Sequence, residues 1–154
     1  MSTMNRRQLL AFLPAVLVAG NRALAQSPAP VVQVVRDPTC GCCLNWVAHL
    51  EKAGFKTTVT ESSDMDAVKD SRRVPKAARS CHTATVGRYV LEGHVPAADV
   101  KRLLQEAPDV LGLAVPGMPV GSPGMESSSG RVQPFDVLTF NRQGQTKVYA
   151  SYGR

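Results

Sequence analysis

The sequence DPTCGCC at residues 37–43 places three of the chain's four cysteines within four positions. It follows a β-branched run, VVQVV at residues 31–35, which predicts a buried strand. It precedes a run whose apolar side chains recur at intervals of three and four, which predicts a helix over residues 42–53. The cysteines are therefore expected at the turn from this strand into this helix.

The rest of the chain predicts an α/β fold of one domain. A second strand is predicted over residues 55–60, parallel to the first, followed by a short polar helix from Ser63-Asp64 to about residue 72. A hairpin of residues 84–86 and 89–91 and a helix opened by Val95-Pro96 come next. The last predicted parts are a Gly/Pro/Met-rich loop over residues 112–130 and a C-terminal hairpin over residues 135–140 and 146–152. The interpretation is a central mixed sheet with flanking helices.

The N-terminal segment predicts export. Arg6-Arg7 precede an apolar run too short to span a bilayer, and Ala23-Leu24-Ala25 is a small-x-small cleavage site. Residues 1–25 are thus interpreted as a Sec or twin-arginine signal peptide, residues 26–30 as a flexible tether, and residues 31–154 as the domain. We expect a periplasmic protein without stable membrane insertion after cleavage.

Charge argues against nucleic acid as a partner. Loss of Arg6, Arg7 and Arg22 with the signal lowers the formal net charge from +6 to +3. No basic stripe interleaved with aromatic residues is present, and the chain has a single Trp. A charge this small does not indicate a nucleic-acid-binding surface.

Four cysteines in an exported chain allow several interpretations. Two structural disulfides are one, although the adjacent Cys42 and Cys43 would then need at least one tight local bridge. A thiol-disulfide oxidoreductase using Cys40 and Cys43 is another, and a single tetrahedral zinc site is a third. Neighbouring helical residues point about 100° apart, so Cys42 and Cys43 are poorly placed to ligate one zinc ion but could bind different ions of one cluster.

The order of elements, with Cys-x-x-Cys at the first strand-to-helix turn, resembles the thioredoxin-like fold. Thioredoxin-like proteins carry a proline loop beside that motif, and here the matching segment is RSCHT at residues 79–83, without proline. The resemblance therefore brings Cys81 toward Cys40, Cys42 and Cys43. Several thiolates together select Cu(I) above all, or zinc.

Histidines and methionines near this site have two interpretations each. His82, beside Cys81, either ligates metal or orients its loop, and His94 either supports a ligand or caps a helix. Met118 and Met125 are either soft ligands in a loop that covers the site or packing residues.

Four motifs together resemble the CopG family of exported copper-resistance proteins, otherwise known as a domain of unknown function. They are CGCC at residues 40–43, SCHT at 80–83, EGHVP at 92–96 and GLAVPGMPVGSPGME at 112–126. The resemblance implies a thioredoxin-like periplasmic domain that holds a multinuclear copper cluster on Cys40, Cys42, Cys43 and Cys81. It also implies a role in copper homeostasis, in which the protein either binds copper alone or also interconverts Cu(I) and Cu(II). Other periplasmic copper-handling proteins are candidate partners. The resemblance implies a metal-binding or redox-buffering protein more than a copper oxidoreductase.

Overall fold

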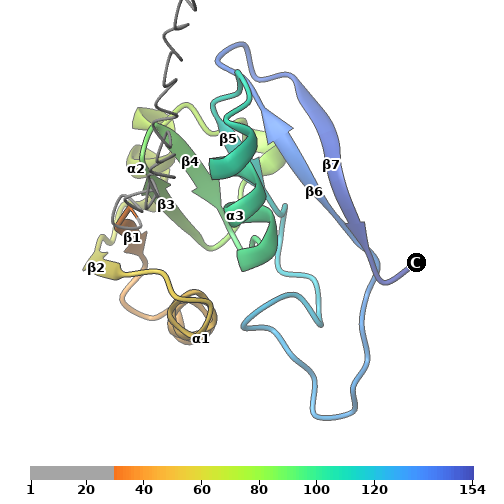
Figure 1. Cartoon of the computed structure of the whole chain (residues 1–154). Helices are drawn as coiled ribbons and strands as arrows, with labels where there is room; N and C mark the ends of the chain where they lie inside the picture. Colours follow the sequence, from red (N-terminus) through yellow and green to blue (C-terminus); the bar gives the residue numbers. More distant parts are fainter. Residues whose placement is uncertain (1–29) are drawn as a thin grey trace, which may run out of the picture.

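The computed structural model describes residues 30–154 (Figure 1). The predicted signal peptide, residues 1–25, and all but the last residue of the predicted tether lie outside the described residues. The elements are β1 (Val32–Arg36), α1 (Gly41–Lys52), β2 (Thr57–Glu61), α2 (Met65–Ser71), a 3-10 turn (Lys76–Ala78), β3 (His82–Val86), β4 (Tyr89–Glu92), α3 (Ala97–Glu106), β5 (Gly112–Ala114), β6 (Phe135–Phe140) and β7 (Thr146–Tyr152). The helices and hairpins predicted from the sequence are present, with ends shifted by a few residues at most.

The seven strands found among residues 30–154 form one mixed sheet in the order β2-β1-β3-β4-β5-β6-β7. β1 and β2 are parallel, as predicted for a strand-helix-strand unit, and β3 and β4 form an antiparallel hairpin beside β1. The mixed α/β class is therefore confirmed. The thioredoxin-like assignment stays a prediction.

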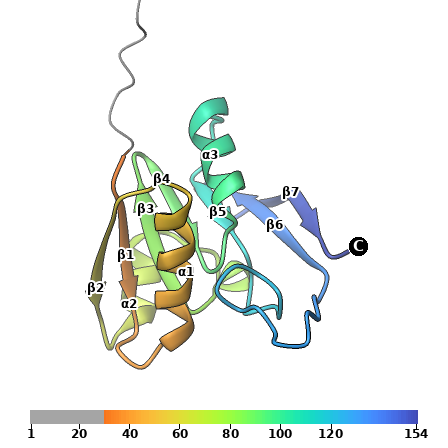
Figure 2. The ribbon, with the colours of Figure 1, turned by 60° about the horizontal axis from the view of Figure 1, so that its bottom comes forward.

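Helices cover both faces of the sheet. Trp46, Val47 and Leu50 of α1 share one core with Val100 and Leu103 of α3, on the face where β1 directs its alternate valines. α2 lies on the opposite face, as Figure 2 shows. The N-terminus of α1 is consequently held against the ends of β1 and β3, where the cysteines lie.

One expectation about the C-terminal third was wrong in detail. The loop predicted over residues 112–130 begins later, because Gly112–Ala114 form β5 between β4 and β6. The predicted C-terminal hairpin is present as β6 and β7, and β6 pairs with β5 and so continues the central sheet. Three residues carry too short a pattern to predict a strand, and β5 exists because its main chain pairs on both sides.

No helix among residues 30–154 has the length and apolar character needed to cross a membrane.

Candidate metal centre

The turn that presents the cysteines is held by a buried arginine. Nη1 of Arg36, at the end of β1, lies 3.0, 3.2 and 3.1 Å from the carbonyl oxygens of Asp37, Pro38 and Cys40. The second terminal nitrogen of the guanidinium, Nη2, forms an ion pair with the Glu61 carboxylate on β2. Because this side chain satisfies three carbonyls of an irregular turn, the start of α1 has a defined position relative to the sheet.

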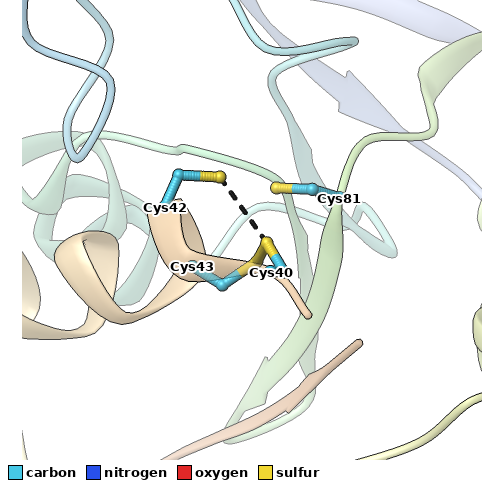
Figure 3. A group of neighbouring side chains, drawn as sticks. All are labelled: Cys40, Cys42, Cys43 and Cys81. Atoms are coloured by element: carbon cyan, nitrogen blue, oxygen red, sulfur yellow. Dashed lines mark hydrogen bonds between the residues drawn. A yellow bond between two sulfur atoms is a disulfide. The ribbon is translucent and has the colours of Figure 1, made fainter. Parts of the chain in front are cut away.

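Four sulfur atoms meet at this helix start. One ligand atom from each of Cys40, Cys42, Cys43 and Cys81 lies within 4.8 Å of the others. The sequence predicted this convergence, and the structure places Cys81 just before β3, facing Cys42 (Figure 3). The group has the compactness that bridging thiolates require.

The four sulfurs are not equivalent. Cys40 and Cys43 form a disulfide, and Cys42 and Cys81 are free, half-buried thiols. The Cys42 Sγ lies 3.5 Å from the Cys40 Sγ. This is the local bridge that the disulfide interpretation required, but it leaves the other two cysteines unbridged. In this state only Cys42 and Cys81 can act as thiolate ligands, and a two-electron reduction would supply the other two.

Two buried histidines contact Cys81. Its Sγ lies 3.2 Å from Nδ1 of His82 and 3.0 Å from Nε2 of His94. The pKa of each histidine is lowered, chiefly because burial penalises the imidazolium. Burial, followed by the neighbouring Cys42, raises the pKa of the Cys81 thiol to about 12. These shifts favour the neutral forms of Cys81, His82 and His94, and a soft cation would displace the Cys81 thiol proton on binding.

A buried ion pair beneath the site was not predicted from the sequence. Glu92 of β4 accepts hydrogen bonds of 2.7 Å from Lys69 Nζ, from the Ser80 N–H and from the Thr83 hydroxyl. Glu92 is fully buried and Lys69 nearly so. The two lie 23 residues apart and share no local motif, so no sequence signal could have joined them. Their contacts fix the backbone on both sides of Cys81.

The Gly/Pro/Met-rich loop packs over the cysteines, as expected. A Cβ on Gly124 (φ +86°) would lie 2.6 Å from the main-chain nitrogen of Trp46, so only glycine lets the loop approach α1 this closely. Met125 lines a cavity of about 490 Å³ together with Cys42, whereas Met118 is 52% exposed. Of the two methionines, Met125 is therefore the one seen to border the cysteine group, and whether either ligates metal stays open.

The histidine expectations are resolved in geometry. His82 lies in the core against the Trp46 ring, with 4.4 Å between ring centroids. His94 contacts Cys81 directly instead of capping a helix. His49 accepts a hydrogen bond of 3.0 Å from the Ala97 N–H at the start of α3.

Comparison with known proteins gives three results. Residues 78–125, which contain Cys81, both buried histidines and most of the loop, match a family described as "Protein of unknown function, DUF411". No curated protein matches the chain. Two solved structures, named "Copper resistance protein copG" form 1 and form 2, are each 47% identical to it.

These two structures are similar to the chain over nearly their whole length. The match to form 1 has a TM-score of 0.77 and covers 82% of this chain and 99% of that one. The match to form 2 has a TM-score of 0.76 and covers 81% and 99%, respectively. With this identity and coverage, the chain belongs to the CopG family of copper resistance proteins.

Proposed function

We propose that this chain is a periplasmic copper-binding protein of copper homeostasis that holds Cu(I) on Cys40, Cys42, Cys43 and Cys81 as a multinuclear thiolate cluster. The observation that carries the proposal is the convergence of four cysteine sulfurs within 4.8 Å. Thiolates are the ligands that Cu(I) prefers, and a sulfur can bridge two ions. The periplasmic location rests on the predicted export signal.

The disulfide supports a redox role for the same site. Breaking the Cys40–Cys43 bond consumes two electrons and yields two thiolates. Two Cu(I) ions oxidised to Cu(II) supply those electrons, and in the reverse direction two Cu(II) ions are reduced as the bond re-forms. The protein would thereby interconvert copper oxidation states without another cofactor.

Anaerobic titration of the fully reduced protein with Cu(I), in competition with a chromogenic Cu(I) chelator, tests the cluster. We expect more than one Cu(I) per chain, and fewer in Cys42→Ser and Cys81→Ser. Met118→Leu is the matched control, since Met118 is exposed and does not line the cysteine cavity. Binding of one ion or none by the reduced wild-type protein would contradict the cluster.

A thiol-disulfide oxidoreductase is the second candidate function, favoured by the Cys40–Cys43 disulfide at the start of a helix. The helix N-terminus stabilises a thiolate at the first cysteine, which promotes exchange. This candidate predicts disulfide reductase activity that depends on Cys40 and Cys43 and survives Cys42→Ser and Cys81→Ser. If those two substitutions also leave copper binding intact, the oxidoreductase function is the better explanation.

A further inference from the structure

A second group of candidate ligands adjoins the four sulfurs and shares Cys81 with them. One ligand atom from each of Cys81, His82 and His94 lies within 4.8 Å of the other two. We propose that these three residues form a one-thiolate, two-imidazole site that binds Cu(II), beside the sulfur group that takes Cu(I). This proposal rests on the proposed copper function and assigns the two oxidation states to two ligand sets that share Cys81.

The spacing of the three ligand atoms suits a single ion. Bonds of about 2.3 Å to sulfur and about 2.0 Å to nitrogen, at 120° to each other, separate the two ligand atoms by about 3.7 Å. The Cys81 Sγ is 3.2 Å from the His82 Nδ1 and 3.0 Å from the His94 Nε2. Each pair must open by less than about 1 Å to admit the ion, which side-chain rotation can supply.

His94 is already oriented as a ligand. Its Nδ1 lies 2.7 Å from the carbonyl oxygen of Pro123, and because a carbonyl only accepts, Nδ1 carries the proton. The neutral ring therefore directs the lone pair of Nε2 at Cys81. Histidines that bind a metal through one ring nitrogen usually donate a hydrogen bond from the other ring nitrogen to a carbonyl or carboxylate, which fixes the orientation of the ring. The loop over the site thus fixes the tautomer that metal binding needs.

His82 is buried with one ring nitrogen directed at the site. It is fully buried and packs against the Trp46 ring. Its Nδ1 lies 3.2 Å from the Cys81 Sγ and is therefore the ring nitrogen placed to bind a cation. Among residues 30–154, its Nε2 has no hydrogen-bond partner, so nothing there holds the ring in the opposite orientation.

The ligands supplied by Cys81, His82 and His94 favour Cu(II), whereas the four cysteine sulfurs favour Cu(I). Two imidazoles and one thiolate in a trigonal arrangement are typical of protein sites that hold Cu(II), whereas thiolates alone select Cu(I). None of the three residues takes part in the Cys40–Cys43 disulfide, so the site exists in either redox state of that pair. A copper ion oxidised at the sulfur group would find ligands for its new oxidation state on the other side of Cys81.

Cu(II) titration of Cys42→Ser, with the Cys40–Cys43 disulfide intact, tests the site with Cys81 as its only free thiol. We expect one Cu(II) per chain, an intense thiolate-to-copper charge-transfer band in the visible spectrum, and pulsed EPR couplings from two imidazoles. Because pulsed EPR reads the ligands directly, no histidine substitution is needed for this result. Cu(II) bound without the charge-transfer band, without imidazole couplings, or not bound at all would overturn the proposal.

Histidine variants of Cys42→Ser supply the controls. His82→Gln and His94→Gln should each remove one imidazole coupling and weaken Cu(II) binding at least tenfold, whereas His49→Gln should change neither, since His49 contacts the Ala97 N–H and not Cys81. Unchanged spectra in His82→Gln and His94→Gln would also overturn the site. Cu(I) titration of the reduced wild-type protein tests the cluster separately, so failure of the histidine site and failure of the copper function are distinguishable.

Discussion

Replacing Lys69 with methionine tests how much the buried ion pair beside Cys81 contributes to the stability of the fold. Methionine is an unbranched side chain one atom shorter than lysine, and it carries no charge and donates no hydrogen bond. The Glu92 carboxylate would then remain fully buried, with Ser80 and Thr83 as its hydrogen-bond donors but no counter-charge. Burial already raises the pKa of Glu92, and Lys69 is the largest influence that opposes this rise.

The expected loss is a large share of the stability of a domain this size. Removing one partner of a buried ion pair costs about 3–5 kcal/mol, against a total of about 5–15 kcal/mol for a typical domain. At roughly 4 °C per kcal/mol, the melting temperature should fall by about 12–20 °C. Replacing both residues, as Lys69→Met with Glu92→Leu, should cost less than the sum of the two single changes, because no unpaired charge remains.

Urea unfolding of the disulfide form, followed by fluorescence of the single, buried Trp46, measures these differences. Lys56→Met is the matched control, because Lys56 is exposed and should change the free energy of unfolding by less than about 0.5 kcal/mol. A loss below about 1 kcal/mol in Lys69→Met, or strictly additive effects in the double variant, would refute the reasoning.

Three further predictions concern the surroundings of the site. Burial holds the pKa of His82 well below 6.5, so as the pH falls the unfolded chain takes up this proton before the folded chain does. The free energy of unfolding should therefore fall between about pH 6.5 and 5.5, by up to ~1.4 kcal/mol per pH unit. In His82→Asn, the free energy of unfolding should depend less steeply on pH over this range. Gly124→Ala, whose Cβ meets Trp46, should lower the free energy of unfolding by about 1–3 kcal/mol, and an unchanged urea midpoint would contradict the close packing. Arg36→Leu should cost about 2 kcal/mol and speed amide exchange around Cys40; normal exchange there would show that the arginine does not hold the turn.

Local patterns were sufficient for most elements of the fold. The β-branched run before the cysteines, the three-and-four spacing after them and the turn residues of both hairpins reflect constraints that act within about ten residues. β5 was missed because three residues form a strand only when neighbours pair on both sides. The continuous seven-strand sheet likewise depends on partners far apart in the chain.

For the site, the order of residues alone shows which ligand atoms are available: three cysteines at a helix start, a fourth beside a histidine, and a glycine-rich loop able to cover them. Tertiary structure decided how those atoms are divided. It brought Cys81 to the other sulfurs, joined Cys40 to Cys43, and aimed the lone pair of His94 by means of the Pro123 carbonyl. The physical reason is that residue type sets what a side chain can bind, whereas oxidation, tautomer and burial depend on contacts between segments that only folding brings together.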